Sequence, residues 1–123
     1  MRPDQIRGRD LDAMVARHVF GLLVEERSNA RTGERDFVYA VHPGQLVRVP
    51  FYTASMGASI TVEVELQRRG WRRNHEWAGS QVLARGEARV VLENADGRTV
   101  EASGPLNEAL CRAALKAIEA AES

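Results

Sequence analysis

The densest group of residues able to do chemistry is a short basic and aromatic stretch in the second half of the chain. Its candidate contact residues are Arg68, Arg69, Trp71, Arg72, Arg73 and His75. Guanidinium groups bind phosphates and aromatic rings stack on bases, so the stretch is a candidate surface for a nucleic acid or an acidic protein face. The alternative is structural: the arginines compensate the negative end of a helix, and Trp71 packs on the core from the strand that follows. We favour the structural interpretation.

The three histidines give no sign of a metal site or of acid–base catalysis. His18, His42 and His75 do not lie at metal-site spacing from cysteine, aspartate or one another. We expect His18 to lie partly buried on the core face of a helix. His75 and Glu76 are adjacent, so on a strand they would point to opposite faces and make a poor catalytic pair.

Carboxylates and sequence motifs give no better case for an enzyme. Asp10 with Asp12, and Glu25 with Glu26, have no partner set, so we interpret them as helix-capping and solvated charges. The sequence has no glycine-rich phosphate loop, dinucleotide fingerprint or nucleophile elbow. We therefore expect no enzymatic activity, and the sequence predicts no catalytic residue, cofactor or metal.

Composition and charge place these residues in one small domain. The 123 residues contain no linker-like stretch, so we predict a single α+β domain over residues 1–123. Seventeen basic and seventeen acidic residues cancel, so no overall field attracts a nucleic acid. The single cysteine, Cys111, lies among apolar residues and is predicted to be a buried thiol in a reducing compartment. The sequence has neither a signal-peptide pattern nor a membrane-length apolar run, which predicts a cytoplasmic protein.

Apolar residues at helical spacing predict a helix near each end of the chain. The first begins near Asp10 and ends near Gly21. The last runs from Pro105 to about Ala120, and its apolar surface is too wide for a single sheet to cover. Only one stripe of it is expected to be wet: Glu108, Arg112, Lys116 and Glu119. Either a neighbouring helix or a second subunit covers the rest, and the second case would make the protein a homodimer.

Alternating apolar residues predict two β-hairpins. The first lies between Leu22 and Val49, around a polar turn at residues 28–34. The second has strands near residues 88–92 and 99–103, joined by an Asn-Ala-Asp-Gly turn. Antiparallel strands of this kind, together with the helices, indicate an α+β fold.

The segment between the hairpins carries conflicting signals. Ile60, Val62, Val64 and Leu66 alternate with polar residues, which is the period and the composition of a strand. Against this, Thr53 or Ser55 suits the N-cap of a helix, the arginines at 68 and 69 suit its C-terminal end, and Gly70 suits a left-handed stop. The residues alone leave both choices open.

Three segments resemble a family of small phage and prophage proteins, the phage ABA-sandwich domain. They are DLDAMVARHVFG at 10–21, FYTASMGASITVEVELQRRGW at 51–71 and PLNEALCRAALKAI at 105–118. The resemblance implies that Thr53 to Arg69 is helical. It also implies an antiparallel sheet sandwiched between helices, in the order α, β-hairpin, α, antiparallel strands, α. The chain departs from the family in having Leu22 where a Trp is usual, and in its longer first hairpin.

The resemblance implies a phage origin but carries no biochemical activity. With no catalytic constellation in the chain, we expect a phage or prophage accessory protein that acts by contact with a host or phage protein, inhibiting or modulating a host system in the bacterial cytoplasm. The alternative is a small nucleic-acid-binding module that uses the cluster from Arg68 to His75. Net neutrality counts against that alternative. We expect no membrane association.

Overall fold

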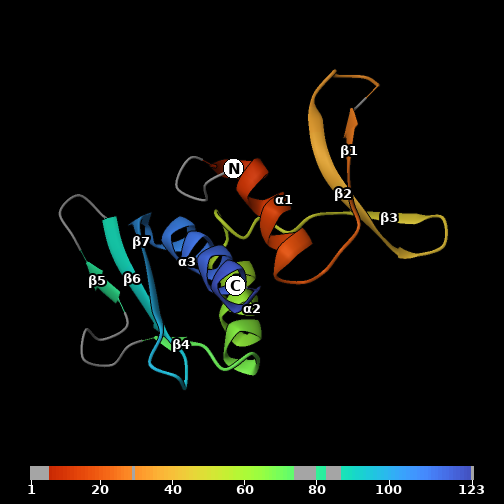
Figure 1. Cartoon of the computed structure of the whole chain (residues 1–123). Helices are drawn as coiled ribbons and strands as arrows, with labels where there is room; N and C mark the ends of the chain where they lie inside the picture. The colour runs from red at the N-terminus through yellow and green to blue at the C-terminus, as the bar shows by residue number, and fades with distance from the viewer. Residues whose placement is uncertain (1–5, 29, 74–79, 83–86, 123) are drawn as a thin grey trace.

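The computed structural model describes residues 6–28, 30–73, 80–82 and 87–122 (Figure 1). Its elements follow the chain in this order: α1 (Gly8–His18), β1 (Val24–Ser28), β2 (Arg35–His42), β3 (Gln45–Arg48), α2 (Met56–Arg68), β4 (Arg72–Arg73), β5 (Ser80–Val82), β6 (Glu87–Glu93), β7 (Thr99–Pro105) and α3 (Leu106–Glu122). The predicted α+β fold with antiparallel strands packed against helices is confirmed.

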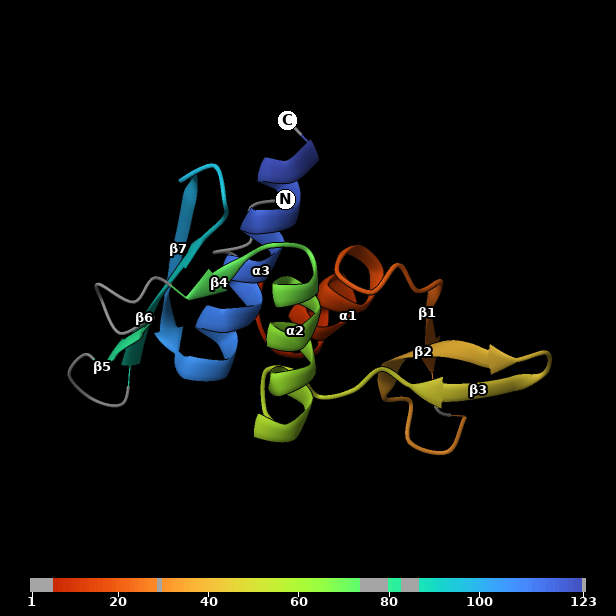
Figure 2. The same ribbon diagram turned by 90° about the horizontal axis from the view of Figure 1, so that it is seen from below.

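Helix α3 is the centre of the molecule. The sheet that contains β6 and β7 packs on one side of it, and α1 and α2 pack on the other (Figures 1 and 2). Ala109, Ala113 and Ala117 are fully buried and let these neighbours approach closely. The wide apolar surface predicted for this helix is therefore covered within the chain, by a sheet and two helices.

One prediction for α3 is wrong. Arg112 was expected in the wet stripe but is only 5% exposed. Its guanidinium folds back along the helix, where Nη2 donates to the carbonyl of Ile6 at 3.2 Å and Nη1 to that of Ser103 at 3.5 Å. The aliphatic part of an arginine side chain can be buried while its guanidinium group donates to backbone carbonyls. The charge of the residue alone therefore does not predict its exposure.

Strand β6 is the middle strand of the sheet on α3. Strand β7 pairs antiparallel along one edge, while β4 and β5 pair along the other. Val90 and Leu92 of β6 and Ala102 of β7 are buried against the helix. The predicted second hairpin is confirmed, and its turn is fixed by the side chain of Asn94, which accepts from the backbone N–H groups of Asp96 and Arg98.

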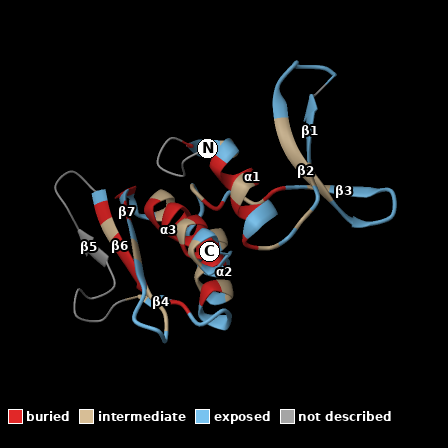
Figure 3. Cartoon of the chain, in the orientation of Figure 1, coloured by how far each residue is buried: buried red, intermediate tan, exposed pale blue. Residues whose placement is uncertain are grey.

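The remaining strands form a second sheet in the order β1-β2-β3, which we call the arm. The described residues 30–32 form a turn within the predicted stretch 28–34, and a further turn at Gly44, with φ of 78°, adds β3. Most of the arm is exposed (Figure 3). Its contact with the core comes from Val24, Phe37 and Tyr39.

Arg9 on α1 joins the arm to the rest of the molecule. Its guanidinium donates to Asp36 of β2 at 2.9 Å, to Asp12 at 2.8 Å and to the carbonyl of Val49 at 2.8 Å. It also lies 4.0 Å from the centre of the Phe51 ring. One side chain thus ties α1, β2 and the segment before α2 together.

Helix α1 differs from expectation in its charged residues. It begins at Gly8, so Asp10 lies in its first turn rather than at the N-cap. His18, expected on the core face, is exposed. Asp12, interpreted as solvated, is fully buried, and its Oδ1 accepts from the backbone N–H of Thr53 at 2.8 Å. That partner is distant in the sequence, so the local pattern could not reveal it.

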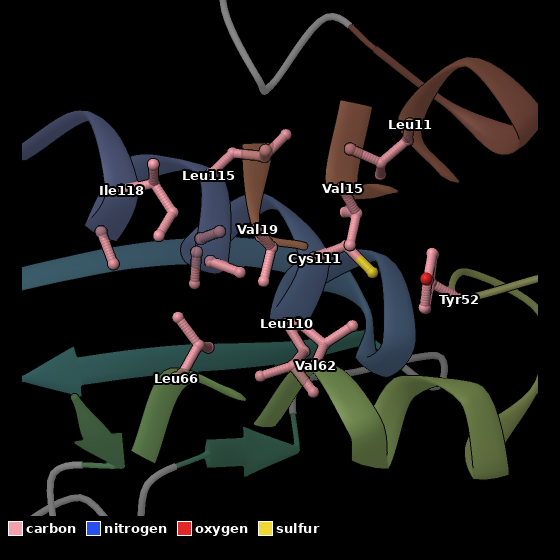
Figure 4. Close-up of a cluster of buried hydrophobic side chains, with 14 of the residues drawn as sticks. Leu11, Val15, Val19, Tyr52, Val62, Leu66, Leu110, Cys111, Leu115 and Ile118 are labelled. Carbon is pink, nitrogen blue, oxygen red and sulfur yellow. The ribbon is translucent and has the colours of Figure 1, made fainter. Parts of the chain in front are cut away.

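The helices meet in one apolar cluster. Figure 4 shows side chains from all three helices in this cluster: Val15 of α1, Val62 and Leu66 of α2, and Leu110 and Cys111 of α3. The prediction that Cys111 is buried is confirmed, since it is 0% exposed. Within the described residues, no helix combines the length and apolar character needed to cross a bilayer.

Candidate functional site

Helix α2 is apolar on two opposite sides, and only one of them is covered. Val62 and Leu66 are 0% and 1% exposed and face α3. Met56, Ile60 and Val64 are 67%, 52% and 58% exposed. Residues four apart lie above one another on a helix, so these three side chains form a continuous apolar row.

The exposed residues beside this row are uncharged until the last turn of the helix, and the carboxylate that borders it, Glu63, is partly buried and paired with Arg73. Gly57, Thr61 and Gln67 are the exposed neighbours at helical spacing. We call this surface the α2 outer face; it consists of Met56, Gly57, Ile60, Thr61, Val64 and Gln67. Soluble proteins usually fill an exposed helix face with charged and polar residues, so a face with three large exposed apolar side chains is unusual.

Contacts at the start of α2 fix which side faces out. The hydroxyl of Ser55 accepts from the N–H of Ala58 at 3.3 Å and caps the helix. Ser59 is 3% exposed, and its hydroxyl lies 2.9 Å from the side-chain oxygen of Asn107 on α3. With Ser59, Val62 and Leu66 held against α3, the helix cannot turn its outer face inward. The predicted N-cap is therefore confirmed for Ser55, and the helical choice for this segment is confirmed.

The arginines predicted as a contact surface follow directly after the outer face, and two of them are tied to the helix. Arg68 donates from Nε to Glu65 at 2.9 Å. This hydrogen bond lowers the pKa of Glu65 and raises that of Arg68. Arg69 donates to the carbonyl of Val19 at 2.7 Å, and its Nε lies 3.5 Å from Glu65. Both arginines suit the negative end of the helix.

The rest of the predicted cluster divides between the core and the surface. Trp71 is 3% exposed and belongs to the core. Arg73 forms a salt bridge with Glu63 of α2, with Nε and Oε1 2.8 Å apart. Arg72 is exposed on β4. His75 lies outside the described residues. The structure therefore brings Arg68, Arg69, Arg72 and Arg73 to one end of α2, while the aromatic ring described among them, that of Trp71, is buried and not available for stacking.

Sequence reasoning missed the outer face itself, although a signal was present. Ile60 with Val64, and Val62 with Leu66, are two pairs at helical spacing, offset from each other by two residues. Two such pairs reproduce the alternation of a strand while placing one pair on each side of a helix. Once the segment is taken as helical, the same letters predict an exposed apolar side.

Buried titratable groups near α1 are packed rather than reactive. Burial raises the pKa of Tyr52 to about 12, with smaller contributions from Tyr39 and Asp12. Burial likewise raises the pKa of the Cys111 thiol, and Asp12 and Glu108 add to the effect. A thiol held in its neutral form is a poor nucleophile. Across the ranges that the structure describes, no group of three His, Cys, Asp or Glu side chains is placed to hold a metal ion.

A hollow of about 570 Å³ lies at the start of α3, beside β7. Its charged lining is balanced: Arg7, Arg112 and Lys116 against Glu87, Glu101 and Glu108. Lys116 donates to the carbonyl of Glu101 at 2.9 Å, as Arg112 does to other carbonyls nearby. These cations therefore hold the edge of β7, and the hollow offers no surplus charge for a ligand.

Comparison with known protein families, with characterised proteins and with solved structures yields no significant match. The resemblance to the phage ABA-sandwich domain therefore stays a prediction. The α2 outer face, with the arginines at its end, is the candidate functional site that the structure offers.

Proposed function

We propose that this protein is a phage or prophage accessory protein that acts by protein–protein contact, with the α2 outer face as its contact surface. In this proposal it works without catalysis in the bacterial cytoplasm, where it inhibits or modulates a host system. The phage origin rests on the sequence resemblance. The mode of action rests on the molecule itself.

The observation that carries the proposal is the exposed row of Met56, Ile60 and Val64. Burying a side chain of this size stabilises a complex by roughly 1.5–3 kcal/mol. Apolar residues clustered on one face are typical of protein contacts, whereas single exposed ones are common on any protein. Leu23, at 90% exposed, is a single residue of the second kind.

The alternative of a nucleic-acid-binding module has less support. Single-strand binding uses aromatic rings for stacking, and Trp71 is buried. Among the arginines, Arg69 and Arg73 contact groups of the same chain. An apolar face also offers nothing to a phosphate backbone.

A capture experiment with matched variants tests the proposal. The tagged protein is exposed to bacterial host lysate with and without nuclease, alongside the variant Ile60→Asp plus Val64→Asp. Leu23→Asp is the control, because it adds a carboxylate at an exposed apolar residue that is not part of α2. We expect wild type and Leu23→Asp to retain the same proteins after nuclease treatment, and the double variant to lose them.

Two results would count against this function. Equal capture by wild type and the double variant would remove the outer face as the contact surface. Recovery that disappears with nuclease would favour the nucleic-acid module instead. Circular dichroism of each variant shows whether a loss of binding reflects the surface or a loss of fold.

A further inference from the structure

We infer that the occupant of the α2 outer face is an amphipathic helix of another protein, with carboxylates in its first turn. This inference rests on the proposed function and adds the chemistry of the partner. Its basis is the distribution of exposed charge at the two ends of the apolar row.

Among the described residues at the C-terminal end of α2, the most exposed charged side chains are arginines. The side chains of Arg68 and Arg69 are 73% and 39% exposed, and Arg72 next to them is exposed as well. The acidic side chains of Glu63 and Glu65 are only 25% and 14% exposed; Glu63 pairs with Arg73, and Glu65 pairs with Arg68 and Arg69. A partner that reaches this end of the helix meets guanidinium groups, which bind carboxylates through directed hydrogen bonds.

At the N-terminal end, the helix carries no compensating acid. The first turn of α2 contains no Asp or Glu, although the N–H groups of this turn bear partial positive charge. A partner helix lying antiparallel would place its own first turn over the arginines and its negative C-terminal end near this turn. Carboxylates in the first turn also stabilise the partner helix, so the same residues serve both purposes.

The middle of the face suits a helix rather than a strand or a loop. Met56, Ile60 and Val64 are spaced by four residues along about 12 Å of helix. Gly57 sits beside them, and a Cβ added there would meet nothing closer than the Ser55 hydroxyl at 3.8 Å. Packing within the described chain therefore does not require a glycine, which is costly inside a helix. A partner backbone that approaches closely would make use of its absent side chain.

A second copy of this chain fits the charges less well. In an antiparallel pair of α2 helices, Arg68 of each copy would lie at the positive N-terminal end of the other. In a parallel pair, the two sets of arginines would meet. Neither arrangement supplies carboxylates to the exposed guanidinium groups, so a different protein is the better occupant.

Synthetic peptides test the inference directly. The probe is a fluorescein-labelled amphipathic helical peptide of about 18 residues, with a row of leucines and with glutamates in its first turn. A matched peptide carries lysines in place of the glutamates. Fluorescence anisotropy at low salt should give at least about tenfold tighter binding of the acidic peptide, with the difference narrowing as salt rises.

Charge reversal in the protein provides the matched control. Arg68→Glu plus Arg72→Glu should reverse the preference, so that the lysine peptide binds more tightly. If the Arg68 change disturbs the end of α2, Arg72→Glu alone should still reduce the preference, because Arg72 lies outside the helix. Ile60→Asp plus Val64→Asp should abolish binding of both peptides, and Leu23→Asp should leave it unchanged.

The remaining outcomes each overturn the inference in a different way. Equal binding of both peptides, lost with the Ile60 and Val64 change, removes the acidic partner but keeps the proposed contact surface. A mass that doubles with concentration, and returns to monomer with the same change, identifies a second copy as the occupant. Binding of neither peptide rejects the acidic helix, while the lysate capture reports separately on the proposed function.

Discussion

The two sides of α2 contain the same kinds of residue and have opposite surroundings. Val62 and Leu66 on the inner side are almost fully buried, whereas Ile60 and Val64 on the outer side are more than half exposed. The difference comes from α3, whose small residues Ala109 and Ala113 let the inner side approach. Apolar character therefore gives α2 two surfaces suited to packing, and the chain itself covers one of them.

The largest contrast should appear in cysteine reactivity. Cys111 is fully buried and its pKa is raised by burial, so a thiol reagent should reach it only when the protein opens. An Ile60→Cys substitution places a thiol on the outer face. We expect this thiol to react faster than Cys111 by about 10³-fold or more, given the usual free energy of opening. Labelling rates measured by mass spectrometry check this, and similar rates would mean that the core is open or the face is covered.

Truncating side chains on the two sides of α2 should change the free energy of unfolding by different amounts. Leu66→Ala removes a buried side chain that packs against α3, and we expect it to lower the free energy of unfolding by about 2–5 kcal/mol. Ile60→Ala on the outer face should change it by less than about 0.5 kcal/mol. Urea unfolding followed by circular dichroism measures both. Equal losses would show that Ile60 has a covering partner in solution.

For the segment that leads into α2, we expect a loss of stability between those of the inner and outer sides of the helix. Asp12 is buried, accepts from the N–H of Thr53 and faces the Arg9 guanidinium at 2.8 Å. Asp12→Ala leaves both donors without this acceptor, so we expect a loss of about 2–3 kcal/mol. Asp10→Ala, at an exposed residue of the same helix, is the control and should have a much smaller effect. A loss no greater than that of the control would mean that water replaces the Asp12 contacts.

The sequence predicted the elements that carry regular patterns. The β6–β7 hairpin and α3 have periodic apolar residues and turn or cap residues at their ends, so local rules were sufficient. Strand β3 was missed because it has only four residues and little alternation. The alternation of apolar residues in α2 predicted a strand, and the choice of a helix came from the family resemblance and the cap residues.

The sequence did not predict contacts between residues far apart in the chain. Asp12 contacts the backbone of Thr53, 41 residues away, and Arg112 contacts Ile6, 106 residues away. Charge type and spacing predicted that both side chains are exposed to solvent, but folding brings backbone acceptors and donors to them. Four arginines of the predicted cluster gather at one end of α2, and their pairing with Glu63 and Glu65 depends on the helix that precedes them.

The smallest effect should come from the charges that border the outer face. Hydrogen bonding to Arg68 lowers the pKa of Glu65 below its unfolded value of 4.5. A lowered carboxyl pKa stabilises the fold above the unfolded pKa, and this contribution is lost as pH falls through the folded pKa. The free energy of unfolding should therefore decrease below about pH 4.5, and Glu65→Gln should make that decrease shallower.

Asp36→Asn is the matched comparison. Burial acts to raise the pKa of Asp36, but its hydrogen bonds from the Phe37 N–H and from Arg9 outweigh burial and lower it. Urea midpoints between pH 3 and 7 measure both slopes. If Glu65→Gln leaves the slope unchanged while Asp36→Asn reduces it, the pH dependence belongs to the arm, and Arg68 can leave Glu65 for a partner without loss of stability.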